Sequence, residues 1–337
     1  MASIFVTGAN GFIGRHLVEA LVRRGDRVRC LVRPIPRIDP LRELGVEIVV
    51  ADLDDRATLK SATTGVDVVF HLAGLIRTFR SEEFYRVNQQ GTAALAEACA
   101  AQPTPPRLVV VSSVAAAGPT ARGQIRIESD PPSPMSHYGR SKLAGEKEAA
   151  KFAGALPLTI VRPGIVFGPR DTGFIQALRS IRLFRCHLSP GFSPPALSFI
   201  HIADLLELLL RAAERGTRVP ASENGHPGLG RYFAVAPEYP TYAELGRLVR
   251  PMLRRPFAPI IPVPGPLAYC VGGISEFIGH LKGQPEELCV DKIRDALVPS
   301  WACSGEAARR DLDFLPAKPL TQRLQETVEW GLANRWL

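Results

Sequence analysis

The sequence predicts an α/β fold, a doubly wound parallel sheet with a smaller C-terminal substrate-binding domain. Two observations lead to this class. In the first half of the chain, short runs that are apolar nearly throughout alternate with longer segments of helical spacing, as in parallel sheets covered by helices on both faces. A glycine-rich turn directly follows the first run. Doubly wound sheets, which are built from right-handed crossovers, bind their ligands at such carboxyl ends of strands.

Six segments are expected to form the strands: SIFVT (3–7), RVRCLV (27–32), VEIVVAD (46–52), DVVFHLAG (67–74), RLVVVSS (107–113) and LTIVRP (158–163). Between most of them, apolar residues recur at helical spacing, as from Phe12 to Arg24 and from Glu83 to Ala101. Most strands are therefore expected to be followed by a helix that leads the chain back to the end of the sheet at which the strands begin.

The alternation breaks down after about residue 170, where proline and glycine become frequent. One further strand–helix unit is expected at 198–216. We predict a first domain over 1–170, rejoined by 198–216, and a substrate-binding or lid region over 171–197 and 217–337.

The composition is that of an ordinary globular protein, with 46% hydrophobic and 22% charged residues in a chain of 337. Lys and Arg outnumber Asp and Glu by 41 to 33, and the basic residues that make up this surplus of +8 are scattered along the chain. Nucleic-acid binders concentrate their basic residues, so no nucleic-acid partner is expected. The six cysteines and seven histidines show no metal-ligand spacing, so we expect neither a metal nor a disulfide framework.

No secretory signal is visible in MASIFVTGANG, which leads straight into a strand. No run approaches the ~20 uninterrupted apolar residues that span a bilayer. A cytoplasmic protein is the expectation.

The turn VTGANGFIGRHL places Gly8, Gly11 and Gly14 between the first strand and the first helix. Glycines there allow the backbone to approach a pyrophosphate, which then rests on the unpaired N–H groups of the helix. The alternative is a purely structural turn. The position of the motif favours a dinucleotide site.

The end of the second strand indicates which dinucleotide is bound. NAD-binding sheets usually carry Asp or Glu there to hold the ribose 2′-hydroxyl, whereas this chain has Arg33. An arginine can pair with a 2′-phosphate through two parallel hydrogen bonds. We therefore predict NADP as the preferred cofactor, and NAD stays open because Arg33 can also be a solvated loop residue.

Further polar and small residues follow the next strands. Asp52 can accept a hydrogen bond from an adenine amine, and Ala73 and Gly74 leave room for a flat cofactor against the backbone. Asn88 can fix neighbouring backbone groups, and a plain core amide is an equal alternative.

Tyr138 and Lys142 are four residues apart and share a helix face. Either they form an incidental surface pair, or Tyr138 is tuned to exchange protons near neutral pH. A cation ~4 Å from a phenolate contributes about 4 kcal/mol at an effective dielectric of ~20. That energy could lower the pKa of a tyrosine by up to about three units.

The motifs occur in a fixed order: TGxxGxxG, Asp52-Leu53, HLAG (71–74), the N-x-x-G-T at Asn88, Ser112-Ser113, Y-x-x-x-K, VRPGIVFGP (161–169) and FIHIADL (199–205). Together they resemble the extended short-chain dehydrogenase/reductase family, the NAD(P)-dependent epimerase/dehydratase branch of the Rossmann enzymes. The C-terminal segment is similar to the endings of 3β-hydroxysteroid dehydrogenase-like and dihydroflavonol reductase-like members.

The resemblance implies a catalytic triad of Ser113, Tyr138 and Lys142, with Tyr138 as general acid or base. It gives His201 a structural role and places Arg162 at the nicotinamide end. The cofactor-binding residues that it implies, together with Arg33, are Gly8, Asn10, Gly11, Phe12, Ile13, Gly14, Asp52, Leu53, Leu72, Ala73, Gly74, Asn88, Ser112, Tyr138, Lys142, Pro163, Gly164 and Val166.

Departures from the family pattern indicate the substrate. Leu197 and Ser198 replace an R-D pair that is usual in nucleotide-sugar enzymes, and Ala117 replaces a tyrosine. Both changes remove polar groups. We expect an oxidoreductase that interconverts a secondary alcohol and a ketone on a bulky, mainly apolar small molecule, sterol-like or polycyclic. The alternative is a nucleotide-sugar epimerase or dehydratase that reduces its cofactor only transiently.

Residues 263–283 space Leu267, Val271, Ile274, Ile278 and Leu281 along one helical face. This stripe can cap an apolar substrate, rest on a membrane surface, or pack in an ordinary core. By analogy with family members, a homodimer is a further expectation.

Overall fold

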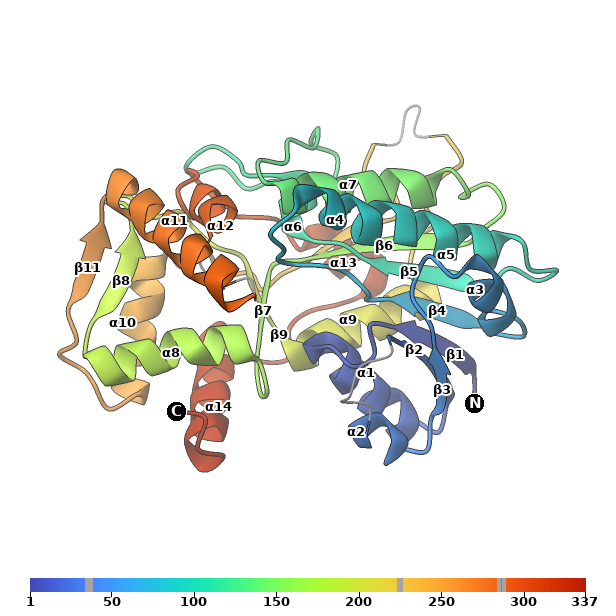
Figure 1. Cartoon of the computed structure of the whole chain (residues 1–337), viewed down its shortest axis with the longest axis horizontal. Coiled ribbons are helices and arrows are strands. Elements are labelled where there is room, and N and C mark those ends of the chain that lie inside the picture. The colour runs from blue at the N-terminus through green and yellow to red at the C-terminus, as the bar shows by residue number, and fades with distance from the viewer. Residues whose placement is uncertain (34–38, 223–226, 284–285, 287–288) are drawn as a thin grey trace.

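The structure is a computed structural model that describes residues 1–33, 39–222, 227–283, 286 and 289–337. Its centre is a seven-stranded sheet in the order β10-β6-β5-β4-β1-β2-β3, in which every neighbouring pair is parallel (Figure 1). The strands are β1 (Ser3–Thr7), β2 (Arg27–Val32), β3 (Glu47–Val50), β4 (Val68–His71), β5 (Arg107–Val111), β6 (Leu158–Pro163) and β10 (Arg231–Ala234). The predicted doubly wound α/β class is confirmed.

Helices cover both faces of the sheet. One face carries α1 (Phe12–Arg23), α9 (Ile202–Arg215) and α13 (Glu306–Leu312). The other face carries α3 (Arg56–Ala62), α5 (Gly91–Ala100) and α7 (His137–Ala150). The helix before α5 is continuous with it, running through α4 (Ser81–Phe84) and a π-helical turn, η1 (Tyr85–Gln90). The short helices α2 (Asp39–Arg42) and α6 (Val114–Ala117) follow β2 and β5.

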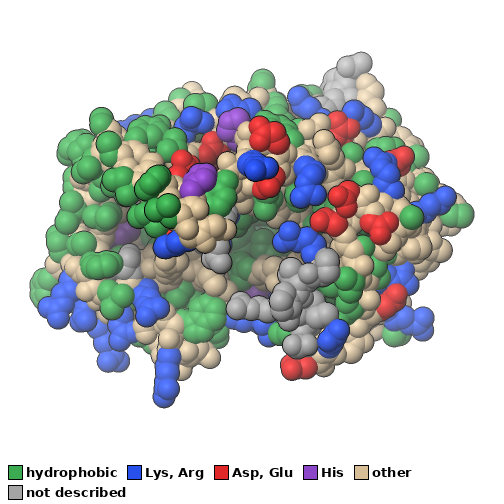
Figure 2. Space-filling view, viewed as in Figure 1, with side chains coloured by type: hydrophobic (Ala, Val, Ile, Leu, Met, Phe, Trp, Pro, Cys, Tyr) green, Lys and Arg blue, Asp and Glu red, His purple; other side chains and the backbone are tan. Residues whose placement is uncertain are grey.

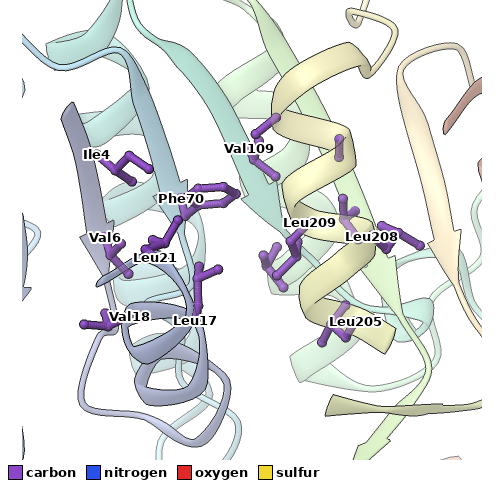
Figure 3. Close-up of a cluster of buried hydrophobic side chains, with 14 of the residues drawn as sticks. Ile4, Val6, Leu17, Val18, Leu21, Phe70, Val109, Leu205, Leu208 and Leu209 are labelled. Atoms are coloured by element: carbon purple, nitrogen blue, oxygen red, sulfur yellow. The ribbon is translucent and has the colours of Figure 1, made fainter. Parts of the chain in front are cut away.

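The spacing of apolar residues explains why the helices lie on the sheet. In α1 the buried residues are Gly14, Leu17, Val18 and Leu21, which form one stripe of a helix. Figure 3 shows side chains of α1 (Leu17, Val18, Leu21) and α9 (Leu205, Leu208, Leu209) on the same face of the sheet, with Ile4, Val6, Phe70 and Val109. Burial of these apolar side chains between the helices and the sheet stabilises the sheet, whose carboxyl edge carries the predicted site residues.

The C-terminal part lies beside the sheet, at the left of Figure 1. Its helices are α8 (Thr172–Phe184), α10 (Tyr242–Met252), α11 (Gly265–Lys282), α12 (Val290–Ala296) and α14 (Leu320–Ala333). Two small parallel sheets pair β7 (Ile165–Phe167) with β9 (Phe199–His201), and β8 (His187–Pro190) with β11 (Ile260–Val263). A separate core cluster, including Phe167, Phe199 and Phe233, holds this part together.

A buried ion pair fixes the C-terminal helix to the rest of the protein. Arg323 of α14 donates to Asp204 of α9 through Nε at 2.9 Å and Nη2 at 2.5 Å. The backbone N–H of Ala317 also donates to Asp204. Such a pair requires both partners, because either charge alone would be costly to bury.

The structure refines the predicted organisation. Helix α9 packs on the main sheet as expected, but β9 pairs with β7 outside it. Strand β10 extends the main sheet next to β6, although its residues fall within the range 217–337 expected for the substrate-binding region. The division into two domains stays a prediction, with β10 and α13 lying against the sheet.

Among the described residues, no helix is both long and apolar enough to pass through a bilayer.

Candidate active site

The turn between β1 and α1 requires glycine at two positions. Gly8 has φ +70°, and a Cβ atom there would lie 2.6 Å from the backbone nitrogen of Ala73. A Cβ atom at Gly14 would lie 2.1 Å from the carbonyl oxygen of Gly8. Helix α1 begins at this turn without a side-chain cap, so its first N–H groups can bind an anion.

A cavity of about 290 Å³ opens directly at this turn. Nine of the predicted cofactor-binding residues line it: Gly8, Asn10, Gly11, Arg33, Asp52, Leu53, Leu72, Ala73 and Gly74. The remaining predicted residues lie outside its lining: Phe12, Ile13, Gly14, Asn88, Ser112, Tyr138, Lys142, Pro163, Gly164 and Val166. The uncapped helix terminus and the side-chain-free turn fit the pyrophosphate of a dinucleotide.

Arg33 and Asp52 come from different strands to the same end of this cavity. Arg33 follows β2 and is exposed, while Asp52 lies just beyond β3. A carboxylate oxygen of Asp52 accepts from the backbone N–H of Leu53 at 2.7 Å, which orients the side chain. A guanidinium and a carboxylate are therefore both available where an adenosine ribose would lie.

Asn88 fixes the backbone beside the site, as one of the two sequence interpretations proposed. Its Oδ1 accepts from the backbone N–H of Leu75 at 2.8 Å, and its Nδ2 donates to the Leu75 carbonyl at 2.9 Å. Nδ2 also donates to Ser141 Oγ in α7 at 2.9 Å. Asn88 therefore joins the loop after β4 to the helix that carries Tyr138.

Ser113, Tyr138 and Lys142 converge at the carboxyl edge of the sheet. Ser113 follows β5 and lies close enough to Tyr138, in the first turn of α7, for its hydroxyl to act on the pKa of that phenol. Lys142 Nζ donates to the carbonyl of Val111, the last residue of β5, at 2.8 Å. A Cβ atom placed on Gly74, which lines the cavity, would lie 3.5 Å from Lys142 Nζ, so Lys142 adjoins the cofactor cavity.

Burial sets the protonation of this group. It raises the pKa of Tyr138 above its ordinary 10.0, while the hydrogen bond from Ser113 opposes the shift and the Asp295 carboxylate adds to it. Burial also lowers the pKa of Lys142 to about 8. Desolvation of the phenolate dominates in the protein alone, so the lowering of the pKa of Tyr138 by Lys142 stays a prediction.

Glu146 and Arg162 form a buried ion pair one helical turn beyond Lys142. Glu146, one turn further along α7, accepts from Arg162 of β6 at 3.0 and 2.6 Å and from the hydroxyl of Ser112. Arg231 of β10 is 3.8 Å from the same carboxylate. Arg162, expected at the nicotinamide end, and Ser112, expected to bind cofactor, both direct their polar side-chain atoms to Glu146 instead.

Gly164, one of the predicted residues at the end of β6, lies where the chain passes close to the segment before β9. A Cβ atom on Gly164 would lie 2.4 Å from the Ser198 carbonyl oxygen, so β7 can pass close to the segment before β9 only with glycine there. His201 caps α9, because its Nδ1 accepts from the backbone N–H of Ala203. That contact supports the structural role expected for His201.

Sequence reasoning missed a set of residues on α12. The carboxylate of Asp291 accepts from the backbone N–H of His137 at 3.1 Å, and the carboxylate of Asp295 lies near Ser136, the cap of α7. Burial raises the pKa of Asp295 to about 6. Lys292 Nζ lies 5.4 Å from the centre of the Tyr138 ring. No local motif marks these residues, which come about 150 positions after Tyr138.

The described part of the chain has no cluster of His, Cys, Asp or Glu suited to a metal ion.

Comparison with known proteins agrees with this geometry. The sequence model of the NAD dependent epimerase/dehydratase family matches residues 4–224. The chain is 32% identical to the ceramide reductase of Caulobacter vibrioides, with 99% of this chain and 96% of that protein covered. It is 33% identical to the sterol demethylase protein B of Methylococcus capsulatus, with 63% of this chain and 66% of that protein covered.

A solved structure supports the same assignment. MoeE5 in complex with UDP-glucuronic acid and NAD matches with a TM-score of 0.75 and 25% identity, covering 99% of this chain and 100% of that one. The family predicted from the motifs is confirmed. This chain is an NAD-dependent enzyme of the extended short-chain dehydrogenase/reductase type and belongs to the NAD-dependent epimerase/dehydratase family.

Proposed function

We propose that the protein interconverts a secondary alcohol and a ketone on a bulky, mainly apolar substrate, with NADP preferred over NAD. The observation that carries this proposal is the convergence of Ser113, Tyr138 and Lys142 beside the glycine turn. When bound, the nicotinamide supplies or accepts the hydride of the reaction.

The three side chains divide the remaining work. Tyr138 gives a proton to the substrate oxygen or takes one from it. Because burial raises its pKa, Tyr138 is protonated at neutral pH in the protein alone, which suits donation to a ketone oxygen. Ser113 hydrogen-bonds the same oxygen and orients it. Lys142 binds the cofactor ribose, and its pKa of about 8 lets it pass a proton onward near neutral pH.

Three residues that replace polar residues usual in sugar-nucleotide enzymes support an apolar substrate. Leu197, Ser198 and Ala117 are uncharged and buried, so these positions offer no charged group to a sugar nucleotide. The relatives named for ceramide and sterol chemistry act, by those names, on lipids. We therefore place a lipid or polycyclic ketone first among the substrates.

A nucleotide-sugar epimerase or dehydratase is the second candidate, favoured by the match to MoeE5 in complex with a sugar nucleotide. We suggest assaying ceramides, sterols, flavonoids and sugar nucleotides with both cofactors while following the absorbance of the reduced nicotinamide. An oxidoreductase changes this absorbance in proportion to product. An epimerase forms product from a sugar nucleotide with no net change, and that result would replace our proposal.

Replacing Arg33 with Ala should weaken NADPH binding by about 10- to 100-fold and NADH binding far less. Hydrogen bonds to charged groups contribute about 1.5–3 kcal/mol each, and only NADPH carries the 2′-phosphate. Cofactor titration of the quenched protein fluorescence measures both dissociation constants. The matched control is Arg27→Ala, an exposed arginine at the opposite end of β2. Equal losses for the two cofactors would refute the NADP preference.

The homodimer expected by analogy stays a prediction.

A further inference from the structure

One end of the molecule exposes large apolar side chains. Phe184, Phe192, Phe257, Ile274, Phe277 and Leu281 are each 61–94% exposed. They belong to the end of α8, the small β8–β11 sheet with its flanking loops, and α11, which are neighbours at the left of Figure 1. We call this region the α11 face. All five stripe residues predicted in 263–283 are exposed, so ordinary core packing is wrong for this helix.

The same region is rich in arginine. Segments 172–203 and 245–275 together contain seven arginines and no Asp or Glu, while the whole chain has a surplus of +8. These two segments therefore carry a local positive charge, although the surplus of the whole chain is spread along it, with 22 Lys and Arg against 17 Asp and Glu in residues 1–171. Figure 2 shows hydrophobic side chains across the left of the molecule and Lys or Arg side chains gathered at its lower left.

We propose that the α11 face docks on the surface of an anionic lipid bilayer. Exposed phenylalanine and aliphatic side chains can enter the boundary between headgroups and acyl chains, and the arginines can pair with lipid phosphates. The charge complementarity selects this occupant. A second copy of the chain would bring arginines against arginines, and a nucleic acid would leave the apolar side chains without partners.

The α11 face is connected directly to the catalytic helix. Helix α11 packs on α12, where Glu276 accepts from the backbone N–H of Val290 at 3.1 Å. Helix α12 in turn contacts the start of α7, because Asp291 accepts from the backbone N–H of His137 at 3.1 Å. A bilayer bound to α11 therefore lies one helix away from Tyr138.

The ring of His280 in α11 also lies 4.2 Å from that of Phe79, in the loop that continues from the cofactor cavity. Helix α11 thus also contacts the loop that continues from the cofactor cavity. If the substrate is apolar, as the proposed function holds, a bilayer on this face would hold it close to the site.

The test is cosedimentation with vesicles of phosphatidylcholine alone and of phosphatidylcholine mixed with phosphatidylglycerol, without substrate or cofactor. We expect stronger binding to the mixed vesicles, decreasing with added salt. Ile274→Ser/Phe277→Ser should reduce the partition coefficient at least about tenfold on the mixed vesicles. Arg179→Glu/Arg254→Glu should reduce binding to the mixed vesicles by a similar factor and remove its salt dependence.

Matched controls carry the same changes at distant exposed sites, Ile125→Ser/Leu315→Ser for the apolar pair and Arg27→Glu/Arg309→Glu for the charged pair. Binding equal to that of the parent protein is expected for both. Docking is refuted if the parent binds neither vesicle, or if the α11-face variants bind as well as their controls. It is also refuted if the parent protein sediments as a dimer in the absence of lipid and Ile274→Ser/Phe277→Ser sediments as a monomer, since the α11 face would then be the dimer interface.

Failure of docking and failure of the proposed function are distinguishable. Turnover of detergent-dispersed lipid ketones without vesicle binding refutes docking alone. Vesicle binding with turnover only of sugar nucleotides leaves docking standing and refutes the proposed substrate class.

Discussion

A Tyr138→Phe variant should bind NADPH like the parent protein and lose about 10²- to 10⁴-fold in turnover. The range is the usual contribution of a general acid or base, and the substitution removes only the hydroxyl that exchanges the proton. Because the ring remains, α7 should keep its position. Turnover is measured with the substrate on which the parent protein is active, and cofactor binding by fluorescence titration.

Ser113→Ala provides the graded comparison. Ser113 orients the substrate oxygen but does not carry the proton, so its loss should reduce turnover less than the loss of the Tyr138 hydroxyl. Thermal unfolding of both variants shows whether the fold is intact. A Tyr138→Phe protein that keeps turnover within about threefold of the parent would remove Tyr138 from the chemistry.

The second large effect is expected on stability. Glu146→Gln should lower the free energy of unfolding by about 3 kcal/mol, because it leaves the Arg162 guanidinium buried without its counter-charge. Arg231 of β10 lies near the same carboxylate, so the substitution loosens three elements at once. Urea denaturation followed by circular dichroism measures the change.

The matched control is Glu148→Gln, two residues along the same helix. Glu148 pairs with exposed Lys151 at the surface, so its replacement should cost less than about 0.5 kcal/mol. Equal effects for Glu146 and Glu148 would contradict a buried pair. In a second test, Glu146→Leu combined with Arg162→Met should restore part of the loss, since it removes Arg162 together with its partner and leaves only Arg231 near the site of the carboxylate.

The Glu146 effect also has a definite pH dependence. Burial alone would raise the pKa of this carboxyl, but Arg162 and Ser112 outweigh it and hold the pKa below its ordinary 4.5. Its stabilisation is therefore fully present above about pH 4.5 and is lost as the pH falls through the lower folded-state value. The difference between parent and Glu146→Gln should shrink in the same range.

Local sequence predicted the sheet well, because its strands are apolar on both faces. Predicted and observed bounds agree for β1, β2 and β6. The predicted segments for β3, β4 and β5 run past the observed ends, and the extra residues include Asp52, Gly74 and Ser113. These residues continue the apolar runs in sequence, yet they leave the ladder to form the site.

Features that depend on distant segments could not be predicted in this way. Strand β10 has only four residues and begins with Arg231, whose charge is acceptable there because Glu146 lies near it. Asp295 reaches Ser136 from a helix about 150 residues away, and no spacing rule relates the two. The pKa of Tyr138 depends on burial, which spacing along one helix does not reveal.

The late position of β10 in the chain has a consequence for biosynthesis. All six residues of β6 are buried in the finished protein, and its outer neighbour is complete only once the ribosome has added Ala234. A nascent chain or proteolytic fragment that stops earlier presents β6 as an open, apolar edge, ready to pair with another polypeptide. Fragments ending near residue 170 should therefore aggregate, and extension beyond Ala234 should restore solubility.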